Sequence, residues 1–166
     1  VVRAFESESV PHPDGSIDPL RDAKMLELEL ILADLSTVER RLERLEANIK
    51  KASKPEDVSE RALFLRLKQS LEAEKPLREV PLSEEEKGRL RGYALLSGKP
   101  MLLVANLGDA DIKQATAWLE RSGLLAFASQ PGLAVCVVAA PIEAEMAELA
   151  PEDAQAFRDD LGLAEP

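Results

Sequence analysis

The sequence predicts an α/β fold in which a mostly parallel sheet is interrupted by a helical hairpin. Residues 100–106 ("PMLLVAN") and 132–140 ("GLAVCVVAA") are continuous apolar runs of strand length, and each is followed by a stretch with helical periodicity. Residues 1–5 ("VVRAF") form a shorter β-branched run that predicts another strand. Apolar strands that alternate with helices are typical of a parallel sheet covered on both faces. A long heptad pattern after the first strand predicts the hairpin.

The first long helix is predicted to begin with Asp18 as its N-cap and Pro19 at the first helical position, where the missing N–H of proline is not needed. Further along, apolar residues alternate at spacings of four and three, which is a coiled-coil seam. Nearer its start the helix is apolar on more than one side, which predicts burial against a globular body. The seam comprises Ile31, Leu35, Val38, Leu42, Leu45, Ile49 and Ala52, and the apolar start comprises Met25, Leu26, Leu28, Leu30 and Leu32.

A second helix is predicted over roughly residues 56–74, because Pro55 prevents the first helix from continuing. Its apolar stripe consists of Phe64, Leu67 and Leu71. The connection is too short for a parallel return, so the two helices are expected to form an antiparallel hairpin. We interpret the hairpin either as a spacer or as an arm that binds a partner.

Three further helical regions are predicted after the hairpin. Ser83 and Glu86 have the spacing of a capping box, which predicts a helix that ends before Gly98. A second helix is expected over 109–123, and one or two helices, interrupted at Pro151, are expected over 142–162.

Composition excludes several classes of protein. The chain has 166 residues and a net charge of -10, which argues against binding DNA or RNA through overall charge, although a local basic patch stays compatible with it. No apolar stretch approaches the length of a membrane span, and no signal peptide is visible. Cys136 is the one cysteine and is expected to be a buried thiol within its apolar run. His12 has no nucleophile beside it and is expected to be a solvated loop residue.

Polar residues at the predicted strand ends indicate a ligand site, because parallel sheets bind ligands outside the carboxyl ends of their strands. Those ends are Phe5, the loop from Asn106 to Asp109, and residues 139–141. An Asn side chain can pair with N7 and the exocyclic edge of a purine, while a carboxylate can accept two hydrogen bonds from guanine. The alternative is that Asp109 or Asp111 caps the helix that follows. We expect Asp109 to cap.

Four stretches together resemble the Obg-like ATPase (YchF) family of the P-loop GTPase superfamily. They are "VVRAFE", "DGSIDPLRDAKMLELELILADLSTVERRLERLE", "GKPMLLVANLGD" and "VCVVAAPIEAEMAEL". The resemblance implies part of a P-loop G domain with an inserted antiparallel coiled-coil hairpin. It assigns residues 1–18 and 76–166 to the nucleotide-binding domain and residues 19–75 to the hairpin. The family's C-terminal TGS domain is not in this chain, and the chain is expected to be a piece of a longer protein.

The resemblance also implies a base-binding site. Phe5 matches an aromatic residue that lies against the base, and Leu107 matches an apolar residue on the base's other face. Asn106 and Asp109 occupy the outer positions of the base-reading motif, whose last residue in the family is Glu. Ala139 and Ala140 replace a Ser-Ala pair, which leaves backbone N–H groups as the contacts. With Asp109 as a cap, ATP is expected to bind at least as well as GTP.

The family resemblance implies an enzyme that hydrolyses ATP, or GTP, with Mg²⁺ and associates with the ribosome in the cytoplasm. This chain, however, contains neither a G-x-x-x-x-G-K-[ST] loop nor a D-x-x-G motif, so it carries no predicted catalytic residue and no metal ligand. We therefore expect it to bind nucleotide weakly by itself. Neither a membrane nor DNA is an expected partner. The alternative interpretation is a non-catalytic helical coiled-coil interaction module.

Overall fold

The computed structural model describes residues 1–7 and 11–161 of the chain. By their contacts the residues divide into two compact units, unit 1 (Val1–Ala23 with Leu102–Pro166) and unit 2 (Lys24–Met101). The division separates the sheet and its helices from a helical region. Residues 76–101, which the sequence analysis assigns to the nucleotide-binding domain, lie within unit 2.

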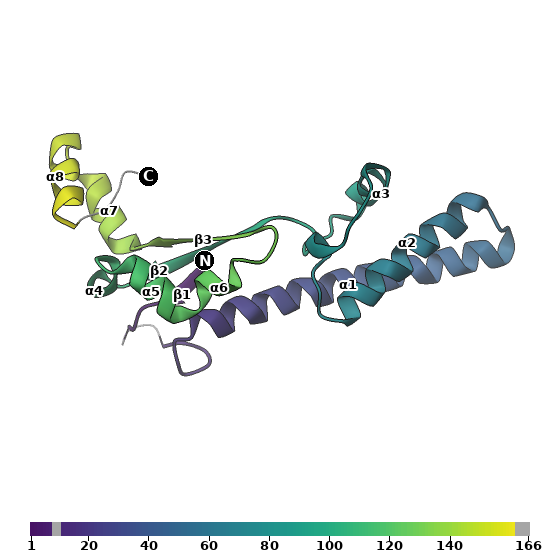
Figure 1. Ribbon diagram of the computed structural model, residues 1–166, viewed down its shortest axis with the longest axis horizontal. Coiled ribbons are helices and arrows are strands. Elements are labelled where there is room, and N and C mark those ends of the chain that lie inside the picture. The colour runs from purple at the N-terminus through teal and green to yellow at the C-terminus, as the bar shows by residue number, and fades with distance from the viewer. Residues whose placement is uncertain (8–10, 162–166) are drawn as a thin grey trace. The chain divides into compact units, whose positions relative to one another are not determined.

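Unit 1 contains a three-stranded sheet in the order β1-β2-β3 (Figure 1). The strands are β1 (Val2–Ala4), β2 (Met101–Leu107) and β3 (Leu133–Val138). β1 and β2 run parallel, with Val2 opposite Ala105 and Ala4 opposite Leu107. The three strands therefore form where the apolar runs predicted them.

Five helices follow strand β2 in the described part of unit 1. α4 (Asp109–Ile112), α5 (Ala115–Ser122) and α6 (Leu124–Phe127) connect β2 to β3, whereas α7 (Ala140–Glu148) and α8 (Pro151–Leu161) follow β3. The helix predicted over 109–123 is broken because Gln114 leaves the helical region, with φ -122° and ψ 31°. The interruption expected at Pro151 is present, since α8 begins there.

Gly123 is needed where α5 ends. Its φ is +75°, in the left-handed region that a side chain rarely adopts, and a Cβ added to it would lie 3.0 Å from Cδ2 of Leu20. The glycine therefore allows both the helix end and the close approach of the segment that carries Leu20.

Only one face of the sheet is covered by the described residues. Val2, Ala4, Leu103, Ala105 and Leu107 alternate along β1 and β2 and are buried. Leu102, on the opposite face, is 59% exposed, and Cys136 of β3 is exposed as well. The predictions of a sheet covered on both faces and of a buried Cys136 are therefore wrong for the described chain, because a continuous apolar strand does not reveal which layer is present to cover it.

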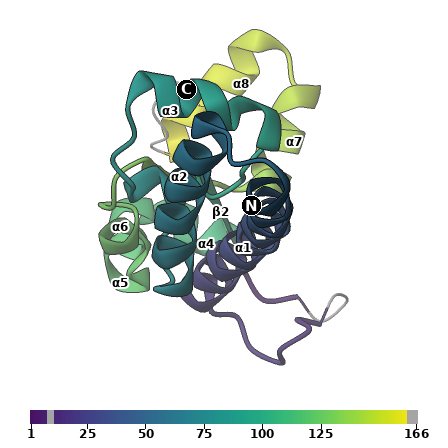
Figure 2. The ribbon, with the colours of Figure 1, turned by 90° about the vertical axis from the view of Figure 1, so that its right-hand side faces the viewer.

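The first long helix begins as its capping signals predict, and its residues from Lys24 onward belong to unit 2. α1 spans Pro19–Lys51, and Asp18 Oδ1 accepts a hydrogen bond of 3.0 Å from the backbone N–H of Arg21. α2 spans Pro55–Glu72, with Pro55 at its start. Lys68 pairs with Glu39 at 2.8 Å and Arg61 with Glu46 at 3.3 Å, so later residues of α1 meet earlier residues of α2. The two helices are thus antiparallel neighbours (Figures 1 and 2).

The core of unit 2 lies between these helices and the segment that follows them. α1 contributes Ile31, Val38 and Leu42, and the same buried cluster continues through Leu77 and Leu90. α2 contributes Leu63, Phe64, Leu67 and Leu71. The predicted seam positions therefore supply much of the core.

The start of α1 differs from its prediction. Met25, Leu26, Leu28 and Leu32 are exposed, by 48%, 39%, 38% and 53%. The expectation that this apolar stretch is buried is wrong for the described residues. Periodicity shows that several sides of the helix are apolar, but burial needs packing partners on each of those sides.

Residues 76–101 pack on the hairpin through short elements. They comprise η1 (Leu77–Glu79), α3 (Glu84–Leu90) and η2 (Arg91–Tyr93). Ser83 and Glu86 form the predicted capping box. The Tyr93 ring meets Phe64 of α2 edge-on, with 4.9 Å between the ring centroids.

A partly buried ionic network also joins this segment to the hairpin. Arg41 donates two hydrogen bonds to the Glu60 carboxylate, of 2.9 and 2.8 Å, and the Tyr93 hydroxyl donates another of 2.8 Å. The hydrogen bonds from Arg41 are the main reason why the pKa of Glu60 is lowered from its usual 4.5. Burial raises the pKa of the Tyr93 hydroxyl, and its bond to Glu60 acts in the same direction.

Replacing Leu42 by Ala tests the hairpin core. Leu42 is 7% exposed, so we expect Leu42→Ala to reduce the free energy of unfolding by about 2–3 kcal/mol in urea titrations followed by far-UV circular dichroism. Leu32→Ala is the matched control, because Leu32 lies on the same helix and is 53% exposed; it should change stability by about 0.5 kcal/mol or less. Equal losses in the two variants would contradict the packing described here.

Acidification should weaken unit 2 through Glu60. Because the pKa of the folded state lies below 4.5, the unfolded chain binds the proton first as the pH falls. The stabilisation by the Glu60 charge is complete above 4.5, the pKa of the unfolded chain. It is lost as the pH falls through the lower pKa of Glu60 in the folded state. We expect the stability difference between wild type and Glu60→Gln to shrink between about pH 6 and about pH 3. A difference that stays constant over this range would show that the Glu60 charge contributes nothing.

Candidate functional site

The carboxyl ends of the three strands meet at one edge of the sheet in unit 1. Asn106 lies near the end of β2, opposite Arg3 of β1. The backbone N–H of Ala140, just after β3, donates a hydrogen bond of 3.0 Å to Oδ1 of Asn106. Because this bond joins the ends of β2 and β3, the structure brings together two of the strand-end positions that the sequence singles out, Asn106 and Ala140.

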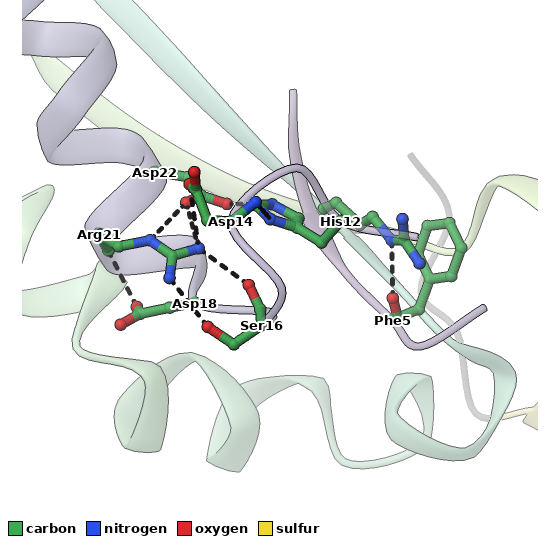
Figure 3. Close-up of polar contacts among 8 residues, drawn as sticks. Phe5, His12, Asp14, Ser16, Asp18, Arg21 and Asp22 are labelled. Atoms are coloured by element: carbon green, nitrogen blue, oxygen red, sulfur yellow. Dashed lines mark hydrogen bonds and ion pairs between the residues drawn. The ribbon is translucent and has the colours of Figure 1, made fainter. Parts of the chain in front are cut away.

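Phe5 is held at this edge by Arg3, a residue that the sequence analysis did not identify. Nε of Arg3 donates a hydrogen bond of 2.9 Å to the carbonyl of Phe5, and its guanidinium carbon lies 4.9 Å from the centroid of the Phe5 ring (Figure 3). Strand alternation places residues i and i+2 on the same side, which is the signal that could have identified the pair. The arrangement fixes the half-buried ring with a cation against it.

The loop after β2 passes next to Phe5. A Cβ added to Gly108 would lie 3.4 Å from Cβ of Phe5, which is van der Waals contact. Gly108 is the residue before α4 and has an extended backbone, with φ -80° and ψ 162°. The Phe5 backbone and the 106–109 loop are therefore neighbours, as a shared binding edge requires.

Asn106 has only half of its side-chain amide free. Its Oδ1 accepts from Ala140, which leaves the two N–H bonds of Nδ2 as the remaining polar groups. A donor suits purine N7, an acceptor that adenine and guanine share. Ala140 uses one of the two lone pairs of Oδ1, so both donors of the amide stay free but only part of its acceptor capacity.

Asp109 does not cap a helix, and this expectation is wrong. It is the first residue of α4, so Gly108 occupies the N-cap position, and no side-chain capping bond is present. The Asp109 side chain is exposed and makes no hydrogen bond or ion pair with the described residues. Asp111, by contrast, lies 3.9 Å from Arg121. The Asp109 carboxylate is thus available to a ligand.

Two other residues that were predicted to contact the base, Leu107 and Ala139, are buried. Leu107 is 0% exposed and Ala139 is 1% exposed. Leu107 lies opposite Ala4, on the covered face of the sheet and on the other side from Asn106. Alternation along β2 thus buries the Leu107 side chain away from the face that carries the Asn106 amide.

His12 and Arg21 hold the loop before α1 in place through polar contacts (Figure 3). Nε2 of His12 lies 3.0 Å from Oδ2 of Asp22, and the His12 side chain is only 12% exposed, so the expectation of a solvated histidine is wrong. Arg21 donates to Asp22, at 3.0 and 2.9 Å, and to Ser16, and lies 3.6 Å from Asp14. These carboxylates neutralise Arg21, so the cluster orders the loop and offers little attraction to a phosphate.

The described residues contain no group of three His, Cys, Asp or Glu side chains that could hold a metal ion. No helix within the described ranges is long and apolar enough to cross a membrane.

Comparisons with known proteins relate the whole chain to one set of proteins. No protein-family model matches the chain. It is 37% identical over 165 residues to the ribosome-binding ATPase YchF of Bacillus subtilis and 34% identical over 166 residues to the protein of that name in Escherichia coli O157:H7. These matches cover 99% and 100% of this chain but 45% of each relative. The chain thus spans about half the length of the curated relatives it matches.

More distant similarities agree with these matches. The chain is 25% identical over 162 residues to Obg-like ATPase 1 of Caenorhabditis elegans, covering 41% of that protein. A solved structure of the Schizosaccharomyces pombe YchF GTPase superimposes with a TM-score of 0.81 at 22% identity, over 99% of this chain and 45% of the other. The superposition confirms the α/β fold.

The bond between Asn106 and Ala140 can be tested by hydrogen exchange. In Asn106→Ala the N–H of Ala140 loses its acceptor, so its amide should exchange about tenfold faster in NMR measurements, the equivalent of one net hydrogen bond. Asn106→Asp retains an acceptor and should retain most of the protection. If Ala140 exchanges at the wild-type rate in Asn106→Ala, the loops after β2 and β3 are not joined by this side chain.

Proposed function

On the premise that this chain corresponds along its whole length to part of a YchF protein, we infer that it supplies the base-binding edge of a purine nucleotide-hydrolysing protein. The intact protein hydrolyses ATP or GTP and associates with the ribosome, as the names of its relatives describe for them. The single observation that supports base recognition best is the junction of strand ends at Asn106. A ribosome-bound role supports the cytoplasmic location that we propose for the protein.

In this proposal the base lies at the edge formed by Phe5 and the loop after β2. The Phe5 ring offers an apolar surface whose position Arg3 fixes. Nδ2 of Asn106 donates to N7 of the purine, while Ala140 holds the Asn106 amide in place. Leu107 and Ala139 support the two loops from the core side, because neither is exposed.

Asp109 is the proposed discriminator between purines. A carboxylate can accept hydrogen bonds from N1–H and the exocyclic amine of guanine, whereas adenine offers an acceptor at N1. The expectation that ATP binds at least as well as GTP requires the Asp109 carboxylate to be engaged as a helix cap. Since its carboxylate is exposed and without a partner among the described residues, we propose that it favours guanine.

Residues outside this chain supply the phosphate and Mg²⁺ contacts in this proposal. The sequence contains no P-loop, and the described residues do not group into a metal site. When bound, Mg²⁺ would neutralise charge on the phosphates. The residues described here bind and orient the base, and the hydrolytic step belongs to the rest of the protein.

The helices over residues 19–75 form the proposed arm, and residues 1–18 with 76–166 form the proposed nucleotide-binding part. The buried positions Ile31, Val38, Leu42 and Leu45 follow the heptad spacing, which supports a coiled-coil pairing of α1 with α2. A helical pair of this kind presents a long polar surface suited to docking on the ribosome. The alternative, a non-catalytic helical interaction module, predicts an intact protein that binds neither ATP nor GTP.

Competition binding of ATP and GTP to the intact protein tests the proposal. We expect Asp109→Ala to weaken GTP binding by about tenfold to a hundredfold, because charge-assisted hydrogen bonds are lost, and to change ATP binding by less than about twofold. Asp111→Ala removes an equal charge from the same helix and should leave the ratio of the two affinities unchanged. Equal weakening of ATP and GTP in Asp109→Ala would show that Asp109 shapes the loop without contacting the base.

A further inference from the structure

Unit 2 contains a cavity of about 420 Å³ that shares no lining residue with the strand-end edge of unit 1. It lies among η1, α3 and the loop of residues 94–99, and all of the residues that line it belong to unit 2. Its size falls in the range of about 300–1,000 Å³ that is typical of small-molecule sites. Its apolar wall consists of Leu77, Val80, Leu82, Leu90 and Leu95.

Basic side chains line the same cavity, and no acidic residue lines it in the part of the chain that the structure describes. Lys87 pairs with Glu84 at 2.7 Å, and Arg78 pairs with Glu27. Arg91 and Lys99 are exposed and have no ion-pair partner among the described residues. In a chain with a net charge of -10, this local excess of positive charge marks a surface that complements an anion.

Arg78 gives a second indication. Its side chain is only 4% exposed, and its Nε is buried without a hydrogen-bond partner, although the Nη2 end of the guanidinium reaches Glu27. Buried donors without a partner are rare in folded proteins. The wall of the cavity therefore carries the Arg78 guanidinium, which is hydrogen-bonded to Glu27 at one end only, beside Arg91 and Lys99, which are unpaired among the described residues.

The rim of the cavity is held in a fixed shape. Ala94, which lines it, has φ 51° and ψ 37°, the left-handed conformation that residues other than glycine rarely adopt. The carboxylate of Asp34 holds the next part of the loop through the N–H groups of Leu96 and Ser97, each at 2.7 Å. The Ser97 hydroxyl then accepts from the N–H of Leu77 at 3.2 Å. A preformed rim lowers the ordering cost of binding.

We propose that this cavity binds a small amphipathic anion. The apolar body of the ligand lies against the leucine-rich wall, and its carboxylate, sulfonate or phosphate group lies at Arg91 and Lys99. No aromatic side chain lines the cavity within the described residues, so a chain-like aliphatic body fits it better than a nucleotide base. The proposal is independent of nucleotide binding at the other unit.

Calorimetric titration of the protein with decanoate tests the proposal, with decanol and decyltrimethylammonium as neutral and cationic probes of the same chain length. We expect saturable binding of one decanoate, binding of decanol that is at least about tenfold weaker, and no saturable binding of the cation. Sedimentation with anionic phospholipid vesicles distinguishes a membrane surface from a free amphiphile, and we expect no co-sedimentation.

Charge reversal locates the site. Arg91→Glu with Lys99→Glu should weaken decanoate binding by about tenfold or more. Arg44→Glu with Lys50→Glu makes the same change of charge at exposed positions of α1 and should leave binding unchanged. All four positions are exposed, so far-UV circular dichroism should show folded variants. Absence of decanoate binding, equal affinity for decanol, equal weakening in the two double variants, or capture by vesicles would overturn the proposal.

Discussion

Unit 2 depends most on one buried carboxylate, that of Asp34. The residue is 3% exposed and accepts hydrogen bonds from the N–H groups of Leu96 and Ser97, at 2.7 and 2.7 Å, and from the Ser97 hydroxyl, at 2.6 Å. A carboxylate removed from water is strongly destabilising without such donors, so the loop of residues 94–99 must stay on α1 for unit 2 to fold. The Ser97 hydroxyl in turn accepts a hydrogen bond from the N–H of Leu77, at the start of η1. One side chain of α1 thereby positions both ends of the segment that packs on the hairpin.

Local signals predicted the elements well, because each depends on a few adjacent residues. Asp18 and Pro19 marked the start of α1, and Ser83 with Glu86 marked α3. Burial was harder to predict, as Met25 and Leu32 show, because it depends on which layer covers a given side of an element. Asp34 illustrates the same limit. Nothing in its neighbourhood in the sequence indicates that its partners lie more than sixty residues away.

At the candidate base site, the sequence predicted which residues lie at the sheet edge but not how their side chains are bonded. Parallel-sheet topology predicted that Phe5, Asn106 and Ala140 would share an edge, and the structure places them there. Topology did not predict that Oδ1 of Asn106 would be occupied or that Asp109 would be left free by Gly108. Those two details change the chemistry that we propose, in which Nδ2 of Asn106 donates to N7, an atom common to both purines. In the proposed site, discrimination between the purines depends on the exposed carboxylate of Asp109.

The open face of the sheet makes the only thiol of the chain chemically accessible. Cys136 lies on β3, two residues before the end of that strand, and is exposed. A thiol at such a position reacts with alkylating reagents in the folded state, whereas a thiol under a packed layer is inert. The alkylation rate of Cys136 is therefore a direct measure of whether any other protein segment covers this face, and it needs neither a nucleotide nor an introduced label.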